Sequence, residues 1–180
     1  NMLEIGTQAP DFTLPTVTDG SSISRSQYEG KPLLVVFMSR HCHYVKHIQQ
    51  RFAEVANEYQ DRGVGVVAIS ANDATSYPED APEKLKEQAG ELGFRFPYLF
   101  DESQDTARAY AAACTPDFFL FDRDHRLAYR GRFDGSRPRN DEPVTGSDLT
   151  AALDAVLAGE QIPGEQQRPS MGCSIKWREA

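Results

Sequence analysis

The feature that most constrains the fold is a short apolar run that ends just before a cysteine. Residues 32–38, Pro-Leu-Leu-Val-Val-Phe-Met, are apolar and rich in branched side chains, which is typical of a buried central strand. Cys42 comes shortly after this run, and apolar residues then recur at three- and four-residue steps over residues 43–60, which predicts a helix. This order places Cys42 at the carboxyl end of a strand and at the N-terminus of a helix.

That position suits a reactive cysteine. The backbone N–H groups that lack partners at a helix N-terminus, together with the helix dipole, stabilise a thiolate. A thiolate is the nucleophile in disulfide exchange and in peroxide reduction. Arg40, His41, His43 and Lys46 add positive or protonatable groups around it. We therefore predict thiol redox chemistry with Cys42 as the nucleophile and Arg40 stabilising its thiolate; the alternative is a small buried core residue.

Length, composition and charge limit the class of protein. The 180 residues suffice for one domain with a sizeable core, and 39% hydrophobic with 26% charged residues is ordinary for a globular protein. The net charge of −8 argues against nucleic acid or an anionic membrane surface as a partner. No apolar run approaches the roughly 18 residues of a membrane helix. Residues 1–6 resemble no signal peptide, although a trimmed leader stays open. We expect a cytoplasmic protein.

The cysteine count favours catalysis over a structural disulfide. Cys42, Cys114 and Cys173 are too few and too widely spaced for a secreted disulfide scaffold or for paired zinc knuckles. In a cytosolic chain a disulfide is more often catalytic than structural. A lone thiolate also needs a second sulfur, because a mixed disulfide or a sulfenic acid must be resolved.

Cys173 is the preferred resolving thiol. It stands in a tail reached by the polar arm 161–169, and Ile175 and Trp177 give that tail an apolar anchor. The alternative is a docked C-terminal strand that holds an inert thiol. Cys114 is the second candidate for the resolving role, since it lies two residues before Pro116; it is otherwise a core residue at a helix end.

Strands and helices alternate along the chain. Besides the strand and helix that flank Cys42, we expect strands over residues 64–70, 98–100, 118–122 and 127–132, and a short edge strand or hairpin near residues 12–14. Helices are expected over residues 83–92, 103–113 and 147–157, the last with Ser147 as its N-cap. This order predicts an α/β domain with a mixed sheet over residues 3–158 and a C-terminal arm over 159–180. Ligands of such sheets gather at the carboxyl ends of the strands, where Cys42 falls.

Several motifs match one known family. The chain resembles the alkyl hydroperoxide reductase/thiol-specific antioxidant (redoxin) branch of the thioredoxin superfamily over residues 3–158. The matching residues are Gly6-x-x-Ala9-Pro10-Asp11-Phe12-x-Leu14, then Gly30-Lys31, then the cysteine that opens a helix, and Thr115-Pro116. Residues 169–177 resemble a narrower peroxiredoxin-like group. The resemblance implies a thioredoxin-like fold, with a central mixed sheet flanked by helices, and antioxidant thiol chemistry.

The resemblance also implies roles for particular residues. Thr115-Pro116 matches the cis-proline loop that faces the nucleophile in this superfamily, so Thr115 and Pro116, with Arg40, are expected to bind substrate. Val45 stands where thioredoxins have their second cysteine and where peroxiredoxins have their peroxidatic cysteine. Ser39 lies three residues before Cys42, where the peroxiredoxin pattern has threonine, and no proline is near. The framework is thus peroxiredoxin-like, whereas the cysteine has the place of the thioredoxin nucleophile.

Two further patterns bear on partners. His41, His43 and His47 beside Cys42 suggest copper or zinc, but the residues that flank a cysteine in a tight turn splay apart, so we predict no metal and no cofactor. The basic cluster 130–139 either steers an anionic substrate or is a solvated surface, and the surface reading is favoured.

The predicted function is that of a thiol-dependent oxidoreductase. Its substrate is expected to be a thiol or a disulfide, with peroxide left open, and its reductant an external thioredoxin-type protein. The alternative is a non-catalytic thioredoxin-fold module whose Cys42 senses redox state or holds a partner or a metal. An enzyme needs a second thiol that closes on Cys42, whereas a binding module does not.

Overall fold

A mixed five-stranded sheet forms the centre of the molecule. The computed structural model describes residues 2–179, and the strand order of the sheet is β5-β4-β3-β7-β8. The three strands β3, β4 and β5 are parallel, whereas β7 is antiparallel to both β3 and β8. The bounds are β3 Leu33–Phe37, β4 Gly65–Ser70, β5 Tyr98–Phe100, β7 Asp117–Phe121 and β8 Leu127–Gly131. The expected α/β class and mixed sheet are confirmed.

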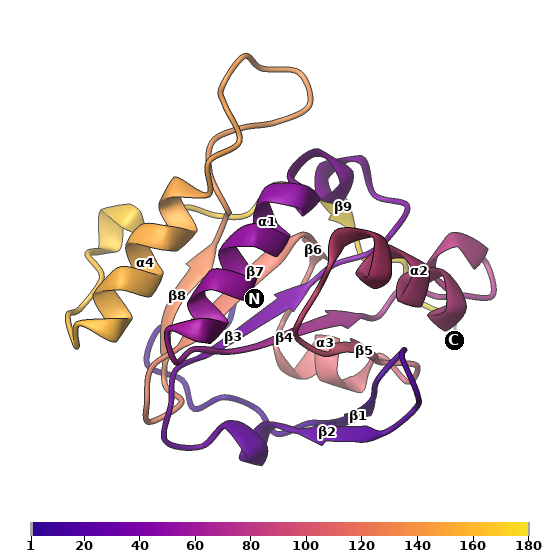
Figure 1. Ribbon diagram of the computed structural model, residues 1–180, viewed down its shortest axis with the longest axis horizontal. Helices are drawn as coiled ribbons and strands as arrows, with labels where there is room; N and C mark the ends of the chain where they lie inside the picture. The colour runs from indigo at the N-terminus through magenta and orange to yellow at the C-terminus, as the bar shows by residue number, and fades with distance from the viewer. Residues whose placement is uncertain (1, 180) are drawn as a thin grey trace.

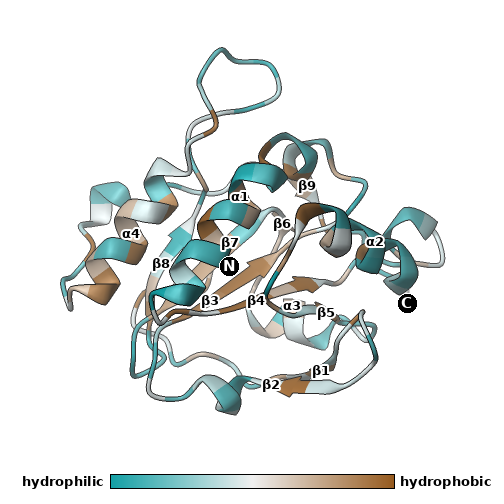
Figure 2. Cartoon of the chain, in the orientation of Figure 1, coloured by the Kyte–Doolittle hydropathy of each residue, from teal (hydrophilic) through white to brown (hydrophobic). Residues whose placement is uncertain are grey.

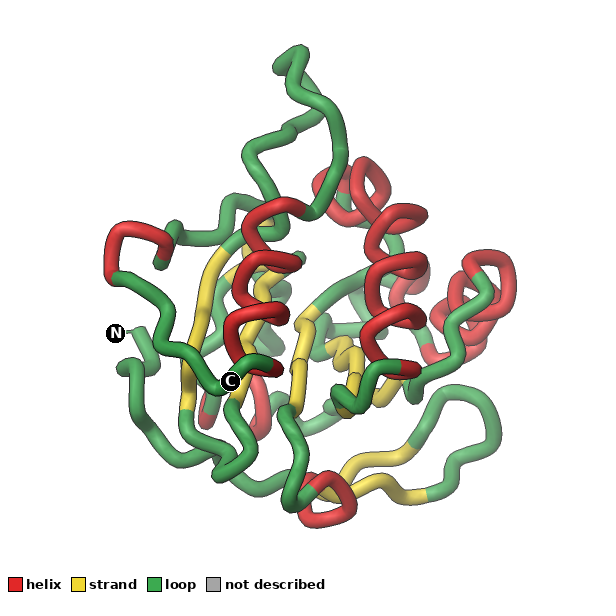
Figure 3. Tube along the Cα trace, turned by 60° about the vertical axis from the view of Figure 1, so that its left-hand side comes forward, coloured by secondary structure: helices red, strands yellow, loops and turns green. Residues whose placement is uncertain are grey.

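Helices cover both faces of this sheet (Figure 1; Figure 3). Their bounds are α1 His43–Asp61, α2 Pro82–Leu92, α3 Asp105–Ala109 and α4 Ser147–Leu157. Alternate residues of β3 point to opposite faces. Leu34 and Val36 pack with α1, α2 and α4, while Leu33, Val35 and Phe37 pack with α3 and the N-terminal segment. Figure 2 shows the brown apolar strands between helices whose outer sides are teal. The continuous apolar run therefore forms a strand buried on both faces.

Smaller elements surround the sheet. They are a hairpin of β1 Thr13–Pro15 and β2 Ser22–Ser24, a pair of β6 Cys114–Thr115 with β9 Cys173–Ser174, and three 3-10 turns, η1 Arg25–Tyr28, η2 Pro78–Asp80 and η3 Gly164–Gln166. The β6–β9 pair is antiparallel and joins the C-terminal tail to the segment just before Pro116. The tail is therefore a docked part of the domain.

Two expected helix boundaries are wrong. The helix expected over 103–113 is only the short α3, because Gln104 and Ala111 have left-handed backbone angles (φ 68° and 52°) that no α-helix contains. Ser147 is the first residue of α4 and not its N-cap, since Gly146, at φ 76°, holds that place. The side chain that satisfies the backbone there is Asp134, which accepts the N–H groups of Thr145 and Gly146, both at 2.8 Å.

Within residues 2–179, no helix has the length and apolar character needed to span a membrane.

Candidate active site

Cys42 lies at the junction of β3 and α1, as the sequence predicts. It is the N-cap residue of α1, with extended backbone angles, and its side chain is completely buried. Its sulfur lies 3.3 Å from the carbonyl oxygen of Thr115, and the Thr115–Pro116 peptide bond is cis, as the resemblance implies. The N-terminus of α1 and the cis-proline loop therefore enclose the sulfur from two sides.

The second sulfur at this site belongs to Cys173. The Sγ atoms of Cys42 and Cys173 are 2.6 Å apart, and both cysteines are free. A disulfide bond is about 2.05 Å long, so the two sulfurs are closer than separate thiols normally lie. Cys173 is only partly buried, unlike Cys42. The geometry is that of a dithiol poised to form one disulfide.

A close backbone contact brings the tail to this position. Cys173 lies opposite Thr115, and Ser174 opposite Cys114, in the β6–β9 register. A Cβ atom on Gly172 would lie 2.0 Å from the carbonyl oxygen of Thr115, which is far inside van der Waals contact. Only glycine permits this approach, and the approach sets the Cys173 sulfur over Cys42.

Side chains from two distant loops hold the tail beyond Cys173. The Asn72 side chain accepts the Lys176 N–H at 2.8 Å, and the Gln104 side chain donates to the Lys176 carbonyl at 3.0 Å. Gln104 also accepts the N–H of Arg178, and the Ile175 side chain is buried in the core. Buried polar groups with such partners order the backbone they bind. The tail is thus fixed on both sides of the reactive sulfur.

A buried carboxylate organises the loop before Cys42. Asp80 is completely buried and accepts the backbone N–H groups of Arg40 (2.7 Å) and His41 (3.2 Å). It also contacts the His41 ring nitrogen Nδ1, and Asn72 donates to it at 3.0 Å. Because Asn72 also binds the tail, one short network connects the loop of Cys42 with the strand of Cys173.

The electrostatic environment differs among the remaining thiols. Burial raises the pKa of Cys114 to about 12, and the neighbouring carboxylate of Asp117 adds to this effect. Burial also raises the pKa of Cys173, helped by its contact with Cys42, while the backbone N–H groups at the start of α1 act in the opposite direction. Asp117 itself is buried, which raises its pKa to about 6 despite a hydrogen bond from Ser170 at 2.8 Å. Cys114 is therefore a poorly ionised thiol beside the reactive pair.

The expected substrate-binding residues have other partners. The Arg40 guanidinium lies 2.7 Å from Glu79 and 3.9 Å from Glu87, so its charge is shared with two acids. Thr115 offers its backbone edge to the chain's own tail instead of to a free surface. Pro116 lines a groove beside the cysteine pair.

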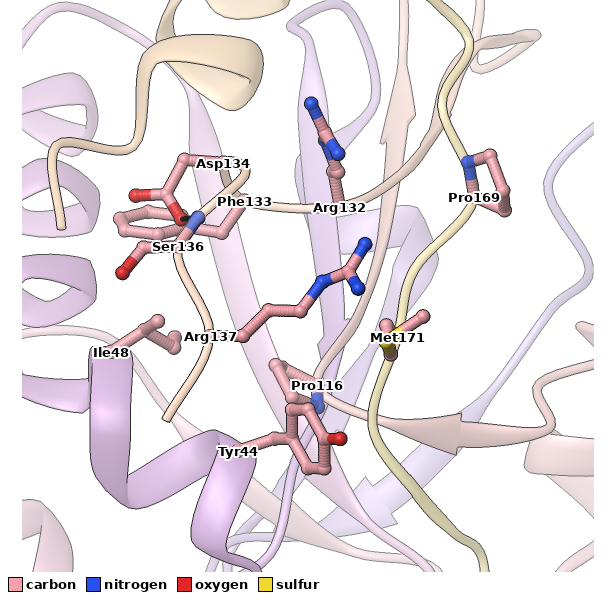
Figure 4. A pocket seen from close by; sticks show the side chains of 10 residues that line it. All are labelled: Tyr44, Ile48, Pro116, Arg132, Phe133, Asp134, Ser136, Arg137, Pro169 and Met171. Carbon is pink, nitrogen blue, oxygen red and sulfur yellow. Dashed lines mark hydrogen bonds between the residues drawn. The ribbon is translucent and has the colours of Figure 1, made fainter. Parts of the chain in front are cut away.

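This groove runs between the start of α1, the loop after β8 and the tail. In Figure 4, Arg137 extends from its loop towards Met171, with Tyr44 and Pro116 close to its side chain. The groove continues past His43, Pro138, Arg139 and Asn140. Tyr44 lies two residues after Cys42, and Met171 two residues before Cys173. The groove is therefore bordered by neighbours of both cysteines, although neither cysteine is among its lining residues.

The histidines near Cys42 are engaged separately. His41 contacts Asp80 and stacks on Tyr77, with ring centroids 5.4 Å apart, whereas the His47 ring nitrogen lies 2.8 Å from the Ser136 hydroxyl. Over residues 2–179 no group of three or more histidine, cysteine or acidic side chains is arranged to hold a metal ion.

Sequence reasoning missed the residues that bring the two cysteines together. They are Gly172, Asp80, Asn72 and Gln104. Gly172 stands directly before Cys173, and this glycine is the only one of the four that the local sequence could have indicated. The contacts of Asp80, Asn72 and Gln104 join segments far apart in the chain, so no local pattern reveals them.

Comparison with known proteins places the chain in a defined group. The sequence model of the AhpC/TSA family matches residues 5–130. The thiol-disulfide oxidoreductase ResA of Geobacillus thermodenitrificans is 26% identical over 123 residues, covering 68% of this chain and 66% of that protein. The thiol-disulfide oxidoreductase YkuV of Bacillus subtilis is 28% identical over 121 residues, covering 67% of this chain and 80% of that protein. The chain thus spans just under two thirds of the length of ResA.

Solved structures show the same fold. An uncharacterized conserved protein from Geobacillus kaustophilus is 50% identical, with a TM-score of 0.96 and coverage of 100% of this chain and 95% of that chain. A structure from Chlorobium tepidum described as a putative thiol:disulfide interchange protein DsbE has 24% identity and a TM-score of 0.66. It covers 86% of this chain and 99% of that chain. The second likeness establishes a thioredoxin-like fold.

Proposed function

The chain belongs to the AhpC/TSA family, and on that premise we propose that it is a thiol–disulfide oxidoreductase whose Cys42 and Cys173 cycle between dithiol and disulfide. The relatives named as thiol-disulfide oxidoreductases support the thiol-dependent class. The observation that carries the proposal is the 2.6 Å approach of the two sulfurs, which come from residues 131 positions apart.

The arrangement favours an enzyme over a passive binding module. A module that only holds a partner has no need of a second thiol over Cys42, whereas an exchange cycle requires one. Cys173 supplies the second thiol of the pair, and Cys114 is left with a pKa of about 12, which keeps it protonated at neutral pH. We therefore assign the cycle to Cys42 and Cys173.

The oxidant in this proposal is a disulfide substrate. Val45 occupies the place of the peroxidatic cysteine in the peroxiredoxin pattern, and the named relatives are thiol-disulfide oxidoreductases. An external thioredoxin-type protein in a reducing compartment such as the cytoplasm completes the cycle, since the Cys42–Cys173 disulfide must be reduced after each turnover.

Turnover of a small neutral disulfide tests the proposal. Wild type, Cys42→Ser, Cys173→Ser and Cys114→Ser are compared with hydroxyethyl disulfide as oxidant and dithiothreitol as reductant, beside a peroxide-consumption assay. We expect wild type and Cys114→Ser to accelerate disulfide reduction, and both other variants to lose that activity. Equal activity in all four proteins would contradict the proposal, and peroxide consumption without disulfide reduction would replace the proposed oxidant.

A further inference from the structure

We propose that the groove beside Cys173 binds a small disulfide carrying carboxylate groups and presents it to the Cys173 sulfur. This inference rests on the proposed function and names its substrate class and its point of attack. We call the groove lined by His43, Tyr44, Arg137, Pro138, Arg139, Asn140 and Met171 the basic groove.

Exposure identifies the sulfur that a substrate meets first. Cys42 is completely buried beneath the tail, whereas Cys173 is only partly buried. Met171 and Tyr44 line the basic groove, and each stands two residues from one of the cysteines. Cys173 is therefore the more accessible sulfur for a molecule bound beside the pair.

The docked tail argues against an extended polypeptide as the bound partner. The backbone edge of Thr115, which the resemblance assigns to an extended substrate, is already paired with Cys173. The close approach of Gly172 to the Thr115 carbonyl leaves no space for a further strand there. A compact disulfide that enters through the basic groove needs no displacement of the tail.

Charge determines which compact disulfide fits. Arg137 and Arg139 are exposed, and within residues 2–179 neither forms an ion pair. The residues that line the basic groove include no acid. Of the acids in the same loop, Asp134 is buried and accepts three backbone N–H groups, and Glu142 lines a different depression together with Arg132. Asp141 is exposed beside Asn140 and does not line the groove. The groove is therefore positive in a protein whose net charge is −8. Guanidinium groups bind carboxylates in a matched fork geometry.

The chemistry balances with the two protein thiols alone. The thiolate of Cys173 attacks one sulfur of the substrate RSSR and releases RS⁻, leaving an RS group bound to the Cys173 sulfur as a mixed disulfide. The thiolate of Cys42 then attacks the Cys173 sulfur, forms the Cys42–Cys173 disulfide and releases the second RS⁻. The two protons lost by the protein thiols are taken up by the two RS⁻ groups. RSSR gains two electrons, the protein pair loses two, and an external dithiol restores the pair.

Substrate charge provides the test. Steady-state kcat/KM is measured for glutathione disulfide (anionic), hydroxyethyl disulfide (neutral) and cystamine (cationic) at low and at high salt, with dithiothreitol as reductant. The variant Arg137→Ala/Arg139→Ala is compared with Lys86→Ala/Arg123→Ala, which removes the same charge from exposed positions outside the groove. An exposed ion pair changes binding by about two- to fivefold, so we expect the groove variant to lose about five- to tenfold with the anionic disulfide at low salt.

The measurements with the neutral disulfide, with the control variant and at high salt distinguish failure of the groove assignment from failure of the proposed function. We expect less than a twofold change with the neutral disulfide and with the control variant, and a smaller anion preference at high salt. An equal loss with all three disulfides, or no loss at all, would overturn the groove assignment. Failure of wild type to turn over the neutral disulfide would instead refute the proposed function.

Trapping of the mixed disulfide tests the point of attack. Cys42→Ser treated with glutathione disulfide should carry glutathione on Cys173, as mapped by peptide mass spectrometry. Cys173→Ser should react more slowly at Cys42, because Asn72, Gln104 and Ile175 still hold the tail over it. Faster labelling of Cys42 than of Cys173 would overturn this part of the inference.

Discussion

Replacing Gly172 by alanine should move the Cys173 sulfur away from Cys42 and weaken formation of their disulfide without unfolding the domain. The added Cβ would lie 2.0 Å from the Thr115 carbonyl oxygen and 2.7 Å from the carbonyl carbon. Both are backbone atoms and cannot move aside as a flexible side chain does. The tail must therefore shift by roughly 1 Å or more, and overpacking of this kind costs about 1–3 kcal/mol.

The expected change in the reduction potential follows because the Cys42–Cys173 disulfide can form only when the tail is docked. A cost of about 1–3 kcal/mol lowers the equilibrium constant for forming the Cys42–Cys173 disulfide by a factor of about 5–150. For a two-electron couple this raises the reduction potential by about 20–65 mV. The midpoint is measured by equilibration in glutathione buffers, alkylation of free thiols and intact mass spectrometry.

Gly164→Ala is the matched control, because Gly164 lies in the same C-terminal arm and no heavy atom lies within 4 Å of its added Cβ. We expect the wild-type midpoint for this variant. A Gly172→Ala protein that also keeps the wild-type midpoint would refute the reasoning that the close approach to Thr115 positions Cys173.

Three other predictions concern buried groups. Because burial raises the pKa of Asp117 from 3.8 to about 6, the folded state holds this proton more tightly than the unfolded state, and wild-type stability falls as the pH rises from about 4 to 6. Asp117→Asn should therefore raise the free energy of unfolding by up to about 3 kcal/mol at pH 7 and by little at pH 4, and denaturant titrations that show no such difference would contradict this. Cys114, with a pKa of about 12, should be alkylated by iodoacetamide at pH 8 about three orders of magnitude more slowly in the native than in the denatured protein, and comparable rates measured by peptide mass spectrometry would be inconsistent with its burial. Asp80→Asn should destabilise the protein by about 1.5–3 kcal/mol in denaturant titrations, because the buried Asp80 side chain accepts the N–H groups of Arg40 and His41, whereas the exposed Glu79→Gln should cost less than about 1 kcal/mol. Equal losses in the last pair would refute the role of the buried carboxylate.

The local parts of the fold were predictable from sequence. The apolar run before Cys42 and the three- and four-residue repeat after it define β3 and α1 because a buried strand and an amphipathic helix impose those periods. Helix ends were less accessible. Ala111 adopts φ 52° although its neighbours are good helix formers. The local sequence therefore does not predict the left-handed turn after α3, which ends at Ala109 and not at residue 113.

The site was predictable in its thiols and not in its geometry. Cys42 and Cys173 stand out by residue type, but their approach depends on a strand pair between segments about 60 residues apart. The clamp formed by Asn72 and Gln104 also depends on tertiary contacts, because each side chain comes from a loop that has no local pattern for binding the tail. For the same reason the sequence offered a docked tail only as an alternative, and it did not indicate that the tail pairs with the backbone edge of Thr115.

Disulfide mapping tests the central claim most directly. The reduced protein is treated with one equivalent of hydrogen peroxide or glutathione disulfide without reductant, quenched by alkylation and analysed by intact and peptide mass spectrometry. We predict the loss of two hydrogens from the intact protein, a single Cys42–Cys173 linkage and an alkylated Cys114. A linkage of Cys42 to Cys114, or an oxidised Cys42 with Cys173 still free, would contradict the account.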